Sequence, residues 1–79
     1  ALGRHFKPRL YGPPGADLTA RETEVLKWTI DGKTAGEIAL ILSISIDTVN
    51  YHVKNATLKM NSPNKATAAV RALAMGLLS

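Results

Sequence analysis

Residues 34–60 read TAGEIALILSISIDTVNYHVKNATLKM, and they contain two helical patterns separated by a very short break. Thr34 and Glu37 have the spacing of a capping box, in which each side chain accepts a hydrogen bond from the other residue's backbone N–H at a helix start. Apolar residues then recur at helical spacing until the pattern stops at Ser43. The pattern predicts a short helix that buries Ile38, Ala39, Ile41 and Leu42.

A second, longer helix is predicted after the break. Ser45 is a favoured N-cap residue, and Asp47 lies in the first turn, where the helix dipole favours a negative charge. The helical pattern continues to Met60. The side expected to face the core carries Val49, Val53, Ala56 and Met60, with His52 at its edge. Two helices joined by so short a turn must cross, which is the geometry of a helix-turn-helix.

The other side of the second helix is largely polar. It carries Asp47, Asn50, Tyr51, Lys54 and Leu58. Amide, phenol and ammonium groups can form hydrogen bonds with base edges or phosphates, so this side is a candidate for insertion into a DNA major groove. A solvated outer face is the commoner reason for such a pattern on an isolated amphipathic helix. The helix pattern alone leaves both interpretations open.

Length and composition exclude several classes of protein. A chain of 79 residues forms one small domain with a modest core and no deep active-site cleft. The sequence has no cysteine, and its two histidines lack metal-ligand spacing, so we expect no disulfide and no metal. Since no catalytic motif or phosphate-binding loop is present, we expect neither an enzyme nor a cofactor in this domain. No apolar run approaches the roughly 18 residues that span a bilayer, which predicts a soluble, cytoplasmic protein with no membrane contact.

The charge of the chain favours a polyanionic partner. The formal net charge is +4 and the sequence pI is near 9.8. Each lysine or arginine that neutralises a phosphate releases bound counterions, which favours binding to nucleic acid. Mild basicity is also common among domains that bind no DNA, so the charge supports the helix pattern without replacing it.

The N-terminal segment is predicted to be a linker. Residues 1–17 hold three of the four prolines and three of the six glycines, a composition typical of a connection from an upstream domain. Its basic residues Arg4, Lys7 and Arg9 either contact phosphates or only solubilise the linker.

Two further helices are predicted around the central pair. Thr19 and Glu22 repeat the capping-box spacing and open a helix that ends before Gly32. We expect it to bury Glu22, Val25, Leu26, Thr29 and Ile30. Trp28 lies largely off this face, where it either covers the linker or an upstream domain or caps the small core at its edge. Asn64 can cap a last helix that Gly76 closes.

The last helix is predicted to have two apolar sides. The expected core face is Ala66, Ala69, Val70, Leu73 and Leu77. A second strip, Ala68, Ala72 and Met75, then has no partner within the chain. Small alanines let two helices approach closely, so the strip is a candidate contact between two copies; scattered exposed alanines are the alternative interpretation.

From residue 18 onward the sequence resembles the LuxR-type helix-turn-helix domain, which is shared with regulators of the FixJ, NarL and GerE kind. The family motifs L-T-x-R-E, G-K-T, E-I-A and T-V-x-x-H correspond to residues 18–22, 32–34, 37–39 and 48–52. The combination of L-K-W, I-L-x-I-S and T-V-N-Y-H is most similar to the quorum-sensing branch. Members of that branch carry an acyl-homoserine-lactone-binding domain before this one.

The resemblance implies an all-α, four-helix helix-turn-helix domain over residues 18–79, with the third helix in the major groove and the fourth pairing two subunits. By position it implies base contacts from Asn50, Tyr51 and Lys54. It implies phosphate contacts from Lys33, Thr34, Thr48 and Lys59. Glu22, Leu26 and Gly32 correspond to scaffold positions.

Two positions depart from the family pattern. Ser43 stands where many helix-turn-helix proteins have glycine, and a serine in a left-handed turn costs about 1 kcal/mol. Leu58 stands where relatives often have a basic residue, and the absence of that cation is expected to weaken phosphate binding.

The expected function is sequence-specific DNA binding as the C-terminal domain of a transcriptional regulator that responds to an acyl-homoserine lactone. The expected partners are double-stranded DNA with a palindromic operator, a second copy of the chain on that DNA, and RNA polymerase. The lactone itself would bind the upstream domain. The alternatives are a response-regulator output domain and a protein-interaction module with vestigial DNA contact.

Overall fold

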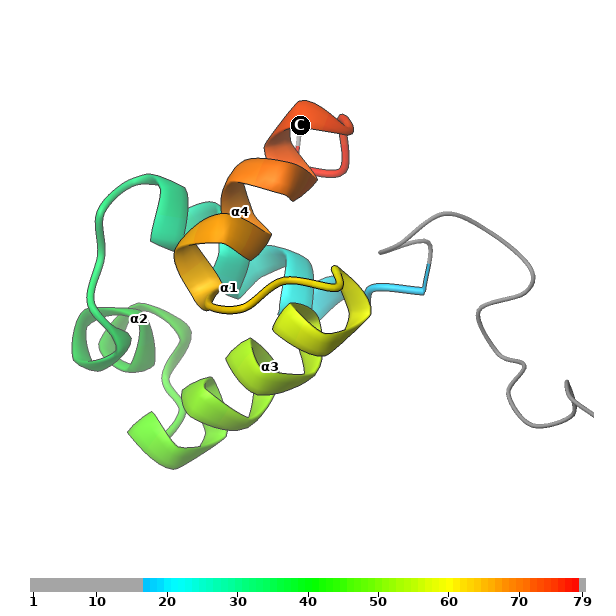
Figure 1. Ribbon diagram of the computed structural model, residues 1–79. Coiled ribbons are helices and arrows are strands. Elements are labelled where there is room, and N and C mark those ends of the chain that lie inside the picture. Colours follow the sequence, from blue (N-terminus) through cyan, green and yellow to red (C-terminus); the bar gives the residue numbers. More distant parts are fainter. Residues whose placement is uncertain (1–16, 79) are drawn as a thin grey trace, which may run out of the picture.

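The computed structural model describes residues 17–78, which form four helices and no strand (Figure 1). The helices are α1 (Ala20–Ile30), α2 (Ala35–Leu42), α3 (Ile46–Lys59) and α4 (Lys65–Ala74). The all-α, four-helix prediction is therefore confirmed. The predicted linker, with Arg4, Lys7 and Arg9, lies outside the described residues except for Asp17. Within residues 17–78, no helix is both long enough and apolar enough to cross a membrane.

Side-chain caps set the start of every helix. In α1 the backbone N–H of Thr19 donates to Glu22 Oε1 at 3.0 Å, and the N–H of Glu22 donates to Thr19 Oγ1 at 3.1 Å. In α2 the same reciprocal pair joins Thr34 and Glu37, at 2.8 and 3.2 Å. Ser45 and Asn64 cap α3 and α4 by accepting hydrogen bonds from Thr48 N and Thr67 N. All four predicted caps are confirmed, because capping depends only on residues three apart.

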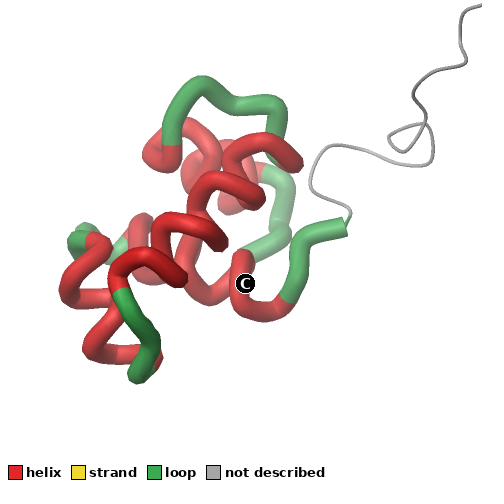
Figure 2. Tube along the Cα trace, turned by 90° about the horizontal axis from the view of Figure 1, so that it is seen from below, coloured by secondary structure: helices red, strands yellow, loops and turns green. Residues whose placement is uncertain are grey.

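The connection between α2 and α3 contains a strained residue. Ser43 has φ 58° and ψ 45°, in the left-handed region that glycine tolerates best. This conformation lets the N–H of Ile44 donate to the carbonyl of Ala39 at 3.0 Å, which closes the end of α2. The chain then turns from α2 into α3 over residues 43–45, one of the connections drawn in green between the red helices of Figure 2.

Two apolar clusters form the core, and α1 contributes to both through adjacent residues. The first joins α1, α3 and α4: Leu26, Ala56, Met60, Ala68, Ala69, Ala72 and Leu78. The second joins α1, α2 and α3: Val25, Ile38, Ala39 and Val49. Trp28 is half-buried against the second cluster, so the expectation that it sits at the core's edge is confirmed. The two clusters hold α1 behind α3, which leaves the other side of α3 uncovered.

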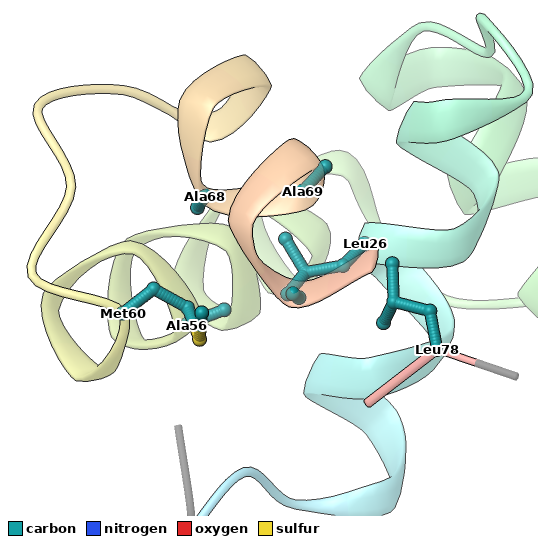
Figure 3. Packing of buried hydrophobic residues seen from close by; sticks show 7 residues of the cluster. Leu26, Ala56, Met60, Ala68, Ala69 and Leu78 are labelled. Carbon is teal, nitrogen blue, oxygen red and sulfur yellow. The ribbon is translucent and has the colours of Figure 1, made fainter. Parts of the chain in front are cut away.

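The predicted facing of α4 is wrong. Ala68 and Ala72 are fully buried, whereas Val70 and Leu73 are 59% and 51% exposed. The alanine side pairs with Leu26 and Met60, as Figure 3 shows for Ala68 and Ala69. The space beside these large side chains accepts only methyl groups if the α4 backbone is to lie close to α1 and α3. Ala66 is also exposed, and only Ala69 and Leu77 of the expected core face are buried or half-buried.

Two isoleucines also depart from the prediction. Ile41 is 42% exposed, because α2 packs mainly against α3 and a helix with one neighbour buries a narrow stripe. Ile30 is 38% exposed at the last residue of α1. Ile30 and Leu73 border the same shallow hollow, so the Ile30 side chain lies at the edge of the α1–α4 contact.

Candidate nucleic-acid interface

The uncovered side of α3 is the best candidate for a binding surface. Asn50, Tyr51 and Lys54 are exposed, with Tyr51 at 63%. On the opposite side, Val49 and Ala56 are fully buried. The predicted facing of this helix is therefore confirmed. Its 14 residues extend roughly 21 Å at about 1.5 Å per residue.

The exposed side of α3 has three properties that suit base recognition. Asn50 offers both an amide donor and an amide acceptor, and Lys54 offers an ammonium that has no ion-pair partner within residues 17–78. The Tyr51 ring meets the His52 ring edge to face, with centroids 5.4 Å apart. Because His52 is half-buried, this contact restricts the Tyr51 ring while its hydroxyl stays accessible. Leu58, on the same side, is 63% exposed and adds an apolar surface instead of a charge.

The starts of α2 and α3 come together beside this surface. Thr34 and Ser45 line one shallow hollow, and a Cβ on Gly36 would lie 3.9 Å from Ile46 Cδ1. Thr48 joins the same group, because its Oγ1 is 2.9 Å from Ser45 Oγ. The structure therefore brings the predicted phosphate-contact residues Thr34 and Thr48 to one end of the helix pair.

A carboxylate accompanies each of these helix starts. Glu37 and Asp47 are both exposed in the first turns of α2 and α3. The hydrogen bond from the Thr34 backbone lowers the pKa of Glu37 most, and the Thr34 side chain and the nearby Lys33 lower it further. Glu37 therefore stays ionised and offsets the positive end of the α2 dipole. Lys33, half-buried just before Thr34, supplies the opposing positive charge.

The Lys59 side chain is held against the start of α1 by two hydrogen bonds. Its Nζ donates to Glu22 Oε1 at 2.8 Å and to the carbonyl oxygen of Asp17 at 3.2 Å. The Glu22 side chain is 4% exposed and the Lys59 side chain 24% exposed. Its predicted phosphate contact stays a prediction, but the ammonium already has two partners. The sequence did contain a sign of this ion pair, namely Glu22 on a face expected to be buried, because a buried carboxylate needs a cation.

The predicted dimer strip does not form a surface. Ala68 and Ala72 are buried in the first cluster, and of the three residues only Met75 is exposed, at 43%. Unpartnered apolar side chains on α4 are instead Val70 and Leu73. The periodicity of the sequence predicted the opposite facing, because larger apolar side chains are more often the buried ones.

The distribution of charge is more informative than its total. Residues 17–78 contain all six acidic residues but only seven of the ten basic ones, so the described domain is nearly balanced. Within that range Arg21 pairs with Glu24 at 3.2 Å, and Arg71 donates to the carbonyl of Asn61 at 2.6 Å. Lys54 is thus the cation that α3 presents outward. No group of three metal-ligating side chains lies together among the described residues.

Helices α2 and α3 cross and are joined by a three-residue turn. One side of α3 is buried against the core and its other side is polar and exposed. This arrangement defines a helix-turn-helix DNA-binding domain. Residues 16–72 match the family described as bacterial regulatory proteins, luxR family. The chain belongs to this family.

Relatives and solved structures agree with that assignment. The quorum-sensing regulator RhlR of Pseudomonas aeruginosa is 57% identical over 61 residues, which cover 77% of this chain and 25% of RhlR. The crystal structure of Escherichia coli SdiA has a TM-score of 0.79 and 47% identity over 91% of this chain and 30% of SdiA. The structure of the transcription factor GerE has a TM-score of 0.73 and 31% identity over 78% of this chain and 92% of GerE. The chain thus spans about a quarter to a third of RhlR and SdiA, and it corresponds to their helix-turn-helix part.

Proposed function

We propose that this domain binds a palindromic operator in double-stranded DNA for a quorum-sensing transcriptional regulator. The observation that carries the proposal is the two-sided character of α3. One side is packed into both core clusters, which fixes the helix on the domain. The other side is exposed and presents the amide of Asn50, the phenol of Tyr51 and the ammonium of Lys54.

Base reading is assigned to Asn50, Tyr51 and Lys54. An asparagine amide can form two hydrogen bonds with adenine, and a lysine ammonium can donate to guanine O6 or N7. The Tyr51 hydroxyl can act as donor or acceptor. Their shared exposure on one side of α3 supports this assignment.

Phosphate contacts are assigned to Lys33, Thr34 and Thr48. Hydroxyl and ammonium groups at the start of a helix-turn-helix set its register on the duplex without reading sequence. The proximity of Thr34 to the Ser45–Thr48 pair supports a shared contact with one DNA strand. Because Glu37 and Asp47 weaken the positive ends of both helices, Lys33 carries most of the attraction to phosphate.

A second copy of the domain is the proposed partner of α4. Val70 and Leu73 are exposed apolar side chains on one side of this helix. A stable interface usually buries roughly 1,000 Å² or more, which is more than these few side chains can supply. We therefore expect two copies to pair only when one duplex holds both.

We also propose a signal molecule, by analogy with the relatives, and a second protein partner. RhlR is a quorum-sensing regulator of which this chain matches one quarter, so an upstream domain is proposed to bind an acyl-homoserine lactone. Binding of chromosomal DNA requires a cytoplasmic location. RNA polymerase is proposed to contact α2, where Leu40 is 82% and Ile41 42% exposed. This surface also favours the second candidate function, a protein-interaction module.

The proposal is tested by selecting operator duplexes from a random double-stranded pool with the 79-residue chain. Lys54→Ala is expected to weaken binding to the selected duplex by about 1–3 kcal/mol, which is roughly 5- to 150-fold. Lys27→Ala, on the exposed side of α1 beside Trp28, removes the same charge away from α3 and should leave binding unchanged. Failure to enrich any duplex would exclude DNA recognition and favour the interaction module.

A further inference from the structure

Lys59 connects the end of α3 to the start of the domain. It is the last residue of α3, and its two partners, Glu22 and Asp17, lie 37 and 42 residues earlier in the chain. Figure 1 shows the end of α3 beside the beginning of α1. Next to Lys59, Met60 is 1% exposed in the first core cluster. The end of α3 is thus held by one apolar and one ionic contact.

The Glu22 carboxylate accepts hydrogen bonds from two groups that lie far apart in the sequence, the Lys59 ammonium and the Thr19 backbone N–H. The same oxygen, Oε1, accepts from the Lys59 ammonium at 2.8 Å and from the Thr19 N–H of the capping box at 3.0 Å. The ammonium also binds the carbonyl of Asp17, where the described chain begins. We infer that Lys59 is a positioning residue, which fixes the angle of α3 against the start of α1 and does not contact phosphate. This inference rests on the proposed function, since the angle matters because α3 binds DNA.

Burial supports this role over a phosphate contact. The Glu22 side chain is 4% exposed and pairs with no other cation among residues 17–78. If Lys59 turned outward to a phosphate, it would leave a buried carboxylate without a cation. Lys33 and Lys54 require no such exchange, because neither is in an ion pair within the described range.

The chain offers a selective substitution for the test. Glu22→Gln removes the negative charge but keeps an acceptor for the Thr19 N–H, because glutamine also serves at this position of a capping box. Lys59→Met keeps the aliphatic stem and removes the ammonium. The double variant completes a cycle in which each partner is changed alone and together.

Binding of these variants to the selected duplex and to a nonspecific duplex is titrated from about 50 to about 200 mM salt. Either single change is expected to weaken binding to the selected duplex on the order of tenfold, and the double variant should be no weaker than either. Nonspecific binding and the slope of log K against log salt should stay as in the unchanged chain. If Lys59 contacted phosphate, Lys59→Met would reduce that slope by about 0.9, and Glu22→Gln would leave binding unchanged or stronger. Either of these results would overturn the inference.

Two further measurements separate positioning from simple loss of fold. A smaller folded fraction would weaken binding to the selected and the nonspecific duplex equally. Lys59→Arg can keep the ion pair, so it should restore the ratio of the two affinities to that of the unchanged chain. In the unchanged chain, the Lys59 ammonium should stay in contact with Glu22 when the selected duplex is added. The NMR signal of the ammonium reports whether this contact is kept. Loss of that contact on binding would contradict the inference even if every variant failed to fold. Absence of any duplex binding by the unchanged chain would instead reject the proposed function, while the ion pair remained measurable.

Discussion

At the scale of single residues, two non-glycine residues between 17 and 78, Ser43 and Asn61, have a left-handed backbone, and the helix caps are hydrogen-bonded. Ser43 occupies the left-handed region, which costs a side chain about 1 kcal/mol relative to glycine. The side-chain oxygens of Thr19, Thr34 and Ser45 accept backbone hydrogen bonds at 3.1, 3.2 and 3.1 Å. The strain at Ser43 is therefore confined to the turn, where it allows α2 and α3 to cross.

The strain predicts that Ser43→Gly stabilises the domain. The expected gain is up to about 1 kcal/mol in the free energy of unfolding, measured by urea denaturation. Asn61→Gly serves as the matched comparison, because Asn61 has φ 55° but asparagine tolerates this region better than serine. A larger gain at Asn61 than at Ser43 would contradict this account of the turn.

The lowered pKa of Glu37 predicts that the stability of the domain decreases in acid. Hydrogen bonding by Thr34 lowers its pKa in the folded state below the ordinary 4.5, so folding is favoured while the carboxylate is ionised. This contribution is fully present above about pH 4.5 and is lost as the pH falls through the folded pKa. In Glu37→Gln the melting temperature should be lower at neutral pH and should converge with that of the unchanged chain in acid. Parallel curves for the two proteins from neutral pH into acid would show that the capping carboxylate is not responsible.

At the scale of helices, α3 carries two opposite requirements on adjacent residues. Val49 is fully buried beneath the helix, and Asn50 next to it is exposed. A rotation of about 100° per residue separates core packing from the proposed DNA reading without any change in backbone. Substitutions at these two positions should therefore affect different properties.

We predict that Val49→Asp abolishes cooperative unfolding, because it buries an unpaired carboxylate in the second core cluster, at a cost of about 3 kcal/mol or more. Asn50→Ala should keep the fold and lose discrimination between the selected and nonspecific duplexes. Circular dichroism during heating tests the first expectation, and competition binding tests the second. Equal melting curves for both variants would mean that the assigned facing of α3 is wrong.

At the scale of the whole molecule, the domain is small, nearly balanced in charge and left with apolar side chains on α4. Its seven basic and six acidic residues between 17 and 78 give weak overall attraction to DNA. The proposed sources of affinity for DNA are therefore the contacts of α3 and the binding of two copies side by side. The exposed Val70 and Leu73 are the proposed contact between those copies.

Leu73→Glu should abolish cooperative binding to a full palindrome and leave binding to a half-site nearly unchanged, because it places like charges against each other in the pair. Titration of full and half operators measures both quantities. Ala72→Glu is the matched contrast on the buried side of α4, where it should unfold the domain instead. Undiminished cooperativity in Leu73→Glu would move the contact between copies away from this face.

Local features could be predicted from the amino-acid order. The four caps, the helix limits and the facing of α3 depend on residues within a few positions of one another, where spacing alone determines the geometry. The candidate reading residues Asn50, Tyr51 and Lys54 follow from that facing. In a long helix, apolar and polar residues that recur with a period of about 3.6 residues identify the buried side from the sequence.

Features that depend on the distance between helices required the tertiary structure. Two apolar sides of α4 competed for the core, and the alanine side is buried because only methyl groups fit between its backbone and Leu26. The Lys59–Glu22 pair joins residues 37 positions apart, and no local pattern specifies which cation reaches a buried carboxylate. Helix spacing and long-range pairing are properties of the packed domain, since they emerge only when all four helices share one core.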